Sequence, residues 1–308
     1  LLFTQTINTI HMKFAAIDIG SNAARLQISS VLEDEGVISF KRVEYVRFAL
    51  RLGHDVFIDG AISPESEVRI FKLLQAYKLL MELHEVQDYA ICATSAMREA
   101  SNAAEIITRI NKILEMKINV IDGAREAELI NDVVVQSLHP QKNYLHIDVG
   151  GGSTELNIYQ NRKKLASKSF KIGSVRLLEG KEKESDWGKM KHWISSQIVS
   201  MSGPIYAVGT GGNISKLYNI SSEVNESKTM SIVELKKIAA YVSSFTFEER
   251  VHKLRLNTDR ADVIVPASSI YLTAMECAGC PSIFVPDLGL KDGILQMLYD
   301  RYKGRKRA

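Results

Sequence analysis

The sequence contains three turns that are rich in glycine and small polar residues. These turns are Gly20-Ser21-Asn22, Gly150-Gly151-Gly152-Ser153-Thr154 and Gly209-Thr210-Gly211-Gly212. Glycine lets the backbone approach a ligand and point its N–H groups outward, and the small hydroxyls add donors. A single turn of this kind usually only connects two strands. Three of them together predict binding of phosphate groups, although the sequence has no P-loop and no dinucleotide-binding fingerprint.

Two aspartates come just before two of these turns. Asp18 precedes Gly20 and Asp148 precedes Gly150, each near the end of an apolar stretch. Burying a carboxylate is costly unless it is paired or binds a metal. If the two aspartates face each other across a cleft beside phosphates, they suit Mg²⁺ and its waters. The alternative is that each aspartate accepts hydrogen bonds from the amides of its own turn.

Glu126 stands near the start of a predicted helix that follows Asp122. It lies three and four residues before Leu129 and Ile130, so the helical period places it on the apolar, buried face. Arg125, Glu128 and Asp132 fall on the polar face. An inward carboxylate can orient and deprotonate a water, which makes Glu126 a candidate general base. A glutamate that only caps the helix or balances its dipole is the alternative.

Arg98 follows a predicted strand at residues 89–92, in the loop beyond the strand's carboxyl end. Ligands of α/β proteins gather at such strand ends. A guanidinium there can hold a phosphoryl group with two parallel hydrogen bonds and offset the charge of the transition state. An ordinary surface arginine is the alternative. Arg25 and Lys171 are further candidates for the same positive lining.

An internal repeat organises these residues. The segment from Phe14 to Ile28 resembles the segment from Tyr144 to Ile158 at a constant offset of 130 residues. Each copy has the pattern of a buried strand, a tight turn and a second, alternating strand. The repeat therefore predicts a duplicated domain, and clefts between domains are common ligand sites.

The elements after each hairpin support the duplication. We expect a third strand at 41–47, a helix capped by Ser63 before Pro64, and a helix opened by a capping box of Asn102 and Glu105. Strands at 89–92 and 118–121 complete the first half. In the second half we expect strands at 167–172 and 205–208, a helix at 186–200, and another helix after Gly212. Both halves thus follow a mixed α/β pattern.

Composition excludes several classes of protein. The 308 residues are 45% hydrophobic and 24% charged, with a net charge of +3, which is too small to indicate a nucleic-acid partner. Cys92, Cys277 and Cys280 form no disulfide framework and suit the cytoplasm. No apolar stretch is long enough to cross a membrane. We expect the structured chain to begin near Met12, after a disordered extension or a start site set too early. The basic segment 301–307 is either a solvated end or a contact for a polyanion.

The sequence resembles the exopolyphosphatase/guanosine pentaphosphate phosphohydrolase (Ppx/GppA) family from about Met12 to its end. The resemblance rests on segments 16–22, 93–98, 123–130, 147–155 and 259–266. It implies an α/β fold of two actin-like (RNase H-like) ATPase-superfamily domains with a cleft between them. The first domain would comprise residues 12–122 and the C-terminal helix at about 294–308, the second would comprise 123–293, and a hinge is expected near Asp122 and Gly123.

The resemblance also implies an activity. Members of the family remove the terminal phosphate from polyphosphate or from pppGpp, the alarmone of the stringent response, with the help of Mg²⁺. By motif, Glu126 matches the catalytic glutamate, Asp148 and Glu155 match the site of the metal and water, Arg98 matches a phosphate-contacting arginine, and the glycine turns match the phosphate loops.

The sequence differs from the family pattern at several points. Arg125 stands where the family often has a second glutamate, and Lys291 stands where an arginine is expected, which weakens any bidentate contact there. The chain is too short for the extra C-terminal domains of the longer members.

A kinase of the same fold and a non-catalytic protein that binds alarmone or polyphosphate are the alternatives to a hydrolase. A homodimer is possible from the sequence, and no membrane partner is indicated.

Overall fold

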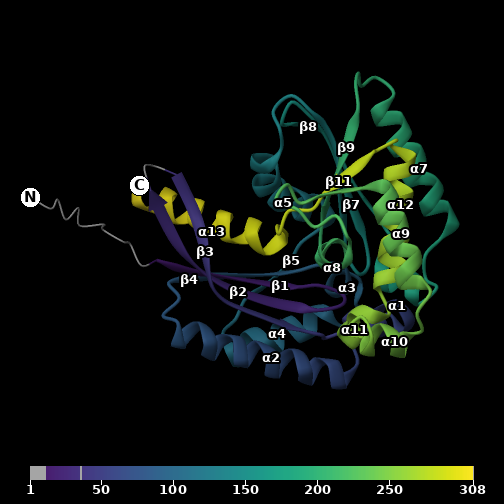
Figure 1. Ribbon diagram of the computed structural model, residues 1–308. Coiled ribbons are helices and arrows are strands. Elements are labelled where there is room, and N and C mark those ends of the chain that lie inside the picture. Colours follow the sequence, from purple (N-terminus) through teal and green to yellow (C-terminus); the bar gives the residue numbers. More distant parts are fainter. Residues whose placement is uncertain (1–11, 35–36, 308) are drawn as a thin grey trace, which may run out of the picture.

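The computed structural model describes residues 12–34 and 37–307, which form two β-sheets flanked by helices (Figure 1). The expected N-terminal extension, residues 1–11, lies outside the described residues. No helix in the described part of the chain has the length and apolar character needed to span a membrane.

The first sheet has the strand order β3-β2-β1-β4-β5. Strands β1, β2 and β3 are antiparallel neighbours, whereas β4 and β5 run parallel to β1. The strands are β1 (Lys13–Ile19), β2 (Ala24–Asp34), β3 (Val37–Phe48), β4 (Asp88–Ala93) and β5 (Ile118–Val120).

The second sheet repeats this plan in the order β10-β11-β9-β6-β7-β8. Three antiparallel strands, β6 to β8, are extended by β9 and β11, which run parallel to β6, and by an antiparallel edge strand, β10. The strands are β6 (Asn143–Val149), β7 (Thr154–Gln160), β8 (Lys163–Phe170), β9 (Ile205–Thr210), β10 (Thr229–Ser231) and β11 (Ser282–Phe284). The duplicated α/β architecture expected from the sequence is confirmed.

The helices cover the outer faces of the sheets and the space between them (Figure 1). In the first half they are α1 (Leu52–Asp59), α2 (Pro64–Leu83), α3 (Ser95–Glu99) and α4 (Ala103–Leu114). In the remainder they are α5 (Gly123–Ser137), α6 (Ser174–Leu178), α7 (Glu184–Ile198), α8 (Gly212–Ile220), α9 (Ile232–Ser243), α10 (Phe247–His252), α11 (Thr258–Ala261), α12 (Ile264–Cys277) and α13 (Leu290–Arg307).

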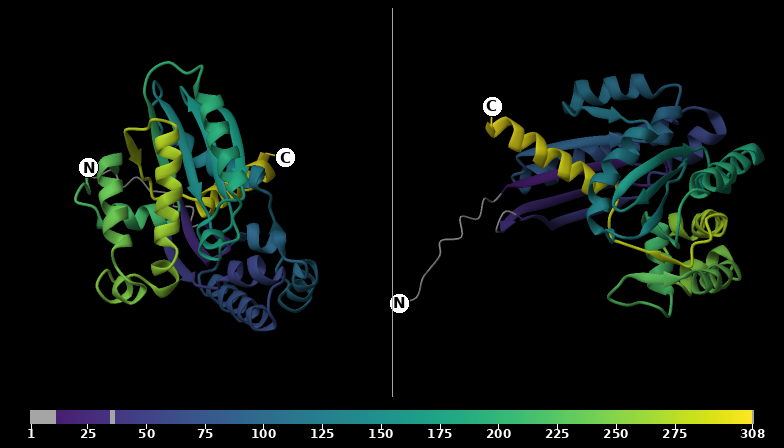
Figure 2. Two further views of the ribbon diagram at one scale, coloured as in Figure 1. Left: turned by 90° about the vertical axis from the view of Figure 1, so that its right-hand side faces the viewer. Right: turned by 90° about the horizontal axis from the view of Figure 1, so that it is seen from above.

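Alternation along the strands creates separate hydrophobic cores. Ile17 and the residues beside it on one face of β1 pack with α2 and α4, and the corresponding face of β6, with Ile147, packs with α7, α9 and α12. The opposite faces of both sheets contribute to a third core together with α5 and α13. Figure 2 shows from above that α13 runs along the strands of the first sheet. Because α5 and α13 share this core with both sheets, they set the two halves against each other.

Two predictions about helix starts have different outcomes. Ser63 accepts a hydrogen bond from the backbone N–H of Ser66 and caps α2, as expected. The predicted capping box at Asn102 is wrong, because this side chain does not cap α4. It bonds the backbone N–H and carbonyl of Ile62 instead, at 3.0 and 2.8 Å. Asn102 therefore ties the start of α4 to the loop before α2.

Candidate active site

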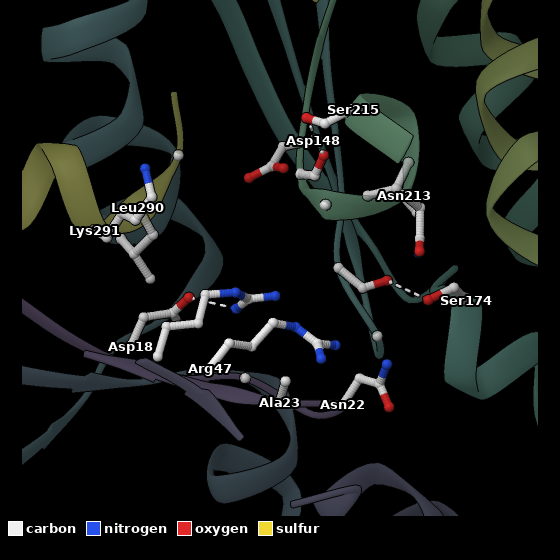
Figure 3. A pocket seen from close by; sticks show the side chains of 18 of the residues that line it. Asp18, Asn22, Ala23, Arg47, Asp148, Ser174, Asn213, Ser215, Leu290 and Lys291 are labelled. Carbon is white, nitrogen blue, oxygen red and sulfur yellow. Dashed lines mark hydrogen bonds and ion pairs between the residues drawn. The ribbon is translucent and has the colours of Figure 1, made fainter. Parts of the chain in front are cut away.

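A pocket of about 330 Å³ lies between the two halves. Figure 3 shows Asp18, Asn22 and Arg47 of the first half on one side and Asp148 of the second half opposite them. Leu290 and Lys291, at the start of α13, line a third side. The cleft predicted between the duplicated halves is therefore present, and the two strand ends with aspartates meet in it.

Strand register places two carboxylates side by side in the second half. Asp148 of β6 is paired with Glu155 of β7 on one side and with Thr210 of β9 on the other. Glu155 is almost fully buried, whereas Asp148 is half-buried and lines the pocket. The hydroxyls of Ser153 and Ser169 both donate to Oε1 of Glu155 at 2.8 Å. Its Oε2 is buried and has no hydrogen-bond partner among the residues that the structure describes.

The first half places opposite charges at the equivalent positions. Asp18 is paired in register with Arg25 of β2. Their ion pair is 2.6 Å long. Arg25 and Glu155 are related by the same offset of 130 residues that relates Asp18 to Asp148. The carboxylate of Asp18 is thus already neutralised, whereas that of Asp148 adjoins a second acid.

Helix α5 adds a third carboxylate to this pair. Asp122 caps the helix by accepting a hydrogen bond from the backbone N–H of Arg125. Glu126, in the first turn, is only 8% exposed and lines the pocket, while Arg125 and Glu128 pair with each other on the outer surface. The predicted inward direction of Glu126 is confirmed. Like Glu155, Glu126 has a buried Oε2 without a hydrogen-bond partner in the described part of the chain.

Glu126, Asp148 and Glu155 form one cluster, in which one oxygen of each lies within 4.8 Å of the others. Burial, together with the charges of Glu155 and Asp148, raises the pKa of Glu126 well above its usual value. Burial raises the pKa of Asp148 to about 6, and burial with the charge of Asp148 raises the pKa of Glu155 to about 7. Buried acids with unpartnered oxygens are expected where a cation binds, and an all-oxygen set suits a hard divalent metal. The cluster therefore fits a metal ion.

Arg98 lies behind this cluster and does not line the pocket in the described structure. Its guanidinium donates to the backbone carbonyl of Ile121 at 2.6 Å, beside the start of α5. It is close enough to Glu126 and Glu155 to favour their charged forms. Lys171 is exposed and pairs with Glu99 at 3.6 Å. It is not among the residues that line the pocket.

The predicted phosphate turns divide into two groups. Those that line the pocket, together with Arg25, are Gly20, Ser21, Asn22, Gly150, Gly151, Gly211 and Gly212. Those that do not are Gly152, Ser153, Thr154, Gly209 and Thr210.

The second group faces the protein interior. A Cβ at Gly152 would meet Phe57 and Ser95, and one at Gly209 would meet Ile283. Thr154 donates to the carbonyl of Ile172 at 2.6 Å. Gly209 and Thr210 belong to β9 rather than to the loop after it. Close packing therefore accounts for part of the glycine and hydroxyl content of these turns.

Several cations of the pocket were not predicted from the sequence. Arg47 is the register partner of Arg25 and forms an ion pair with Asp259 of the second half. Arg260 donates to the carbonyl of Gly212, and Lys216 lines the same side. Burial, with the nearby charge of Arg47, lowers the pKa of Arg260 to about 10. Of these three cations, only Arg47 could have been predicted from a local pattern, because it belongs to an alternating strand beside the strand of Arg25.

Comparisons with known proteins agree on one family. The model of the Ppx/GppA phosphatase family matches residues 31–301. An exopolyphosphatase from Cytophaga hutchinsonii has a similar structure, with a TM-score of 0.81, 26% identity, and coverage of 94% of this chain and 98% of that one. A Ppx/GppA family member from Aquifex aeolicus gives a TM-score of 0.72 at 27% identity, with coverage of 94% and 98%.

Curated relatives are longer than this chain. A bifunctional 3-dehydroquinate synthase/phosphatase of Fusobacterium nucleatum is 28% identical over 89% of this chain and 44% of the relative. A guanosine-5'-triphosphate,3'-diphosphate pyrophosphatase of Aliivibrio fischeri strain MJ11 is 25% identical over 95% of this chain and 60% of the relative. The chain thus spans about half the length of these curated relatives.

Proposed function

Because this chain belongs to the Ppx/GppA phosphatase family, we propose that it hydrolyses the terminal phosphoanhydride bond of inorganic polyphosphate, of pppGpp, or of both. The observation that carries the proposal is the meeting of Glu126, Asp148 and Glu155 at a pocket that glycine turns from both halves also line. The names of the relatives, exopolyphosphatase and guanosine-5'-triphosphate,3'-diphosphate pyrophosphatase, support the same class of substrate.

We propose that Asp148 and Glu155 hold Mg²⁺, which when bound would offset the negative charge of the phosphate oxygens. Asp18 is less suited to this role than the sequence suggested, because Arg25 already neutralises it. The protein's own contribution is to keep the two carboxylates adjacent, with Asp148 at the pocket wall and the buried Oε2 of Glu155 left for a cation.

The substrate's phosphates would lie against the glycine turns and the cationic wall. The N–H groups of Gly20 and Gly150 donate to the carbonyls of Ala23 and Ser153 and so close their turns, and the next N–H groups, those of Ser21 and Gly151, would supply donors to the phosphate oxygens. Arg25, Arg47 and Arg260 line the same pocket and would supply positive charge to the phosphates. The terminal phosphate would then lie at the carboxylate cluster, with the rest of the substrate along these cations.

Glu126 would act as the general base on the attacking water. Its raised pKa makes the ionised form a stronger proton acceptor than an ordinary glutamate. Arg98, whose charge favours the ionised forms of Glu126 and Glu155, would support the cluster and would reach the terminal phosphoryl group only after moving from the Ile121 carbonyl.

An assay of phosphate release tests this proposal. We expect release from polyphosphate or from pppGpp in the presence of Mg²⁺, and none after the metal is chelated. A kinase of the same fold would instead consume ATP only with an acceptor, and a binding protein would retain the substrate without turnover. Absence of Mg²⁺-dependent release from both substrates would contradict the proposal.

A further inference from the structure

A chain of buried polar side chains runs through the second sheet beneath the carboxylate cluster. Asn157 and His146 are cross-strand partners on β7 and β6, one row below the pair of Glu155 and Asp148. Asn157, His146 and Thr210 are all fully buried. Apolar residues occupy this depth elsewhere in the sheet, so packing alone does not explain three polar side chains.

The hydrogen bonds of this chain have a direction. The amide Nδ2 of Asn157 faces Nδ1 of His146 at 3.0 Å, and an amide nitrogen can only donate. The Nδ1 atom therefore accepts, and the imidazole carries its proton on Nε2. Because Nδ1 accepts and carries no proton, the ring has a single N–H.

The Nε2–H of His146 then donates to Oγ1 of Thr210 at 2.8 Å. A hydroxyl that accepts from the imidazole keeps its own proton for another acceptor. Asp148 is next to Thr210 across the β6–β9 pair, and its carboxylate receives a side-chain hydrogen bond from Thr210. Asn157, His146 and Thr210 thus form a relay whose last proton points at Asp148.

We propose that Asn157 and His146 are positioning residues that direct the hydroxyl proton of Thr210 to Asp148 and so hold this carboxylate oriented for a divalent cation. The inference rests on the proposed metal site at Asp148. Partners of metal ligands commonly fix the orientation of the ligand in this way.

The first half of the molecule provides an internal comparison. The position equivalent to His146 is Ala16, and the register partner of Asp18 on the parallel strand is Cys92 in place of Thr210. The relay is therefore present in the half whose aspartate adjoins a second acid, and it is absent from the half whose aspartate is neutralised by Arg25.

Variants at Thr210 test the last step of the relay. Thr210→Val keeps the shape and removes the hydroxyl, whereas Thr210→Ser keeps the hydroxyl. With Mn²⁺ as the probe, measured by calorimetry, we expect binding to weaken by about 10- to 100-fold in Thr210→Val and to stay near the original in Thr210→Ser. Equal affinity in both variants would overturn the proposal.

Variants at His146 test whether it acts through Thr210. The amide of His146→Gln can reach the position of Nε2, whereas the shorter amide of His146→Asn replaces only Nδ1. We expect Mn²⁺ affinity to fall in His146→Asn and to be largely restored in His146→Gln. The double variant His146→Asn/Thr210→Val should bind Mn²⁺ no more weakly than Thr210→Val alone. Additive losses would contradict a shared route.

The tautomer of His146 gives a readout that needs neither metal nor activity. In protein labelled with ¹⁵N-histidine, we expect the signal that disappears in His146→Asn to be that of a neutral ring protonated on Nε2. A ring protonated on Nδ1 would reverse the direction and overturn the relay. If the unaltered protein binds no Mn²⁺, both the proposed metal site and the relay that depends on it are contradicted. If it binds and Thr210→Val binds equally well, only the relay fails.

Discussion

At the residue scale, Asp18 and Asp148 differ in the side chain that stands beside each of them. Arg25 neutralises Asp18 at 2.6 Å, whereas Glu155 adds a second negative charge beside Asp148. The free energy cost of keeping Asp148, Glu155 and Glu126 ionised together appears as raised pKa values. A cation would remove this cost, so the acids that are unfavourable for folding are the ones suited to binding.

The first prediction concerns the pH dependence of stability without metal. The pKa of Glu155 is about 7 in the folded protein, above its value of 4.5 in an unfolded chain. The folded state therefore holds this proton more tightly, and the free energy of unfolding should fall as pH rises from about 4.5 to 7, by at most about 1.4 kcal/mol per pH unit for one proton. Asp148, with a pKa of about 6, adds to the fall over the lower part of this range.

The variant Glu155→Gln serves as the comparison, because it has no proton to lose. In EDTA, we expect the stability of Glu155→Gln relative to the unaltered protein to increase between pH 5 and pH 8, as measured by urea unfolding. Saturating Mg²⁺ should stabilise the unaltered protein more than the variant. A stability difference that does not change with pH would show that Glu155 ionises normally.

The sequence predicted some site residues better than others. The inward direction of Glu126 follows from the helical period alone, and the pairing of Asp148 with Glu155 follows from a tight hairpin. Arg260 reaches the pocket only because α11 packs on α12 and α12 packs on α8, which no local pattern encodes. The interior positions of Gly209 and Thr210 were not predicted. A glycine-rich stretch indicates that another group packs closely against the backbone, but not whether that group is a ligand or the protein's own interior.

At the element scale, the contact between α5 and α13 positions Glu126. Gly293 of α13 lies so close to α5 that a Cβ there would overlap the carbonyl oxygen of Leu129. Gly293→Ala should therefore push the helices apart and destabilise the protein by about 1–3 kcal/mol, measured by urea unfolding. The same shift should reduce phosphate release, because Glu126 is one turn from the contact.

Gly304→Ala is the matched control on the same helix. No atom of the described residues lies within 4 Å of a Cβ at this position. Alanine there should leave the stability unchanged or raise it by up to about 1 kcal/mol through its higher helix propensity. If both variants behave alike, the close contact between α5 and α13 has no energetic role.

The elements themselves were largely predictable, since hydrophobic period and turn residues indicate strands and helices locally. The failure at Asn102 is informative. Its spacing to Glu105 fits a capping box, yet its amide finds two backbone partners at Ile62, far away in sequence. Long-range partners of this kind are invisible to local rules.

At the scale of the whole molecule, a largely buried arginine joins the two halves. Arg176 of α6 is largely buried, pairs with Glu99 of α3 at 2.7 Å, and donates to the carbonyl of Gly152 at 2.9 Å. Its guanidinium also lies 4.1 Å from the ring centroid of Phe57. This set of contacts fixes the second glycine turn against the first half.

Glu99→Gln should weaken that connection. We expect a loss of about 1–3 kcal/mol in the free energy of unfolding, because the charge of the buried Arg176 is left uncompensated. Glu105→Gln removes an exposed partner of Arg109 and should change stability by less than about 0.5 kcal/mol. Thermal and urea unfolding of both variants would measure this, and equal effects would argue against a buried link.

Domain boundaries are the part of the whole-molecule description that stays a prediction. A division at residue 123 assigns α5 to the second half, yet α5 packs on α13, which was assigned to the first. The expected hinge at Asp122 and Gly123 also stays a prediction. The repeat revealed two equivalent halves, but not how tightly α5 and α13 bind them together.

The most direct test of the account is the rate of phosphate release by Glu126→Gln, compared with Glu128→Gln on the exposed face of the same helix. If Glu126 is the general base, its substitution should lower kcat by about 10²- to 10⁴-fold with substrate binding largely intact. Glu128→Gln should retain the original rate. Normal turnover by Glu126→Gln would contradict the proposed role of the carboxylate cluster in hydrolysis.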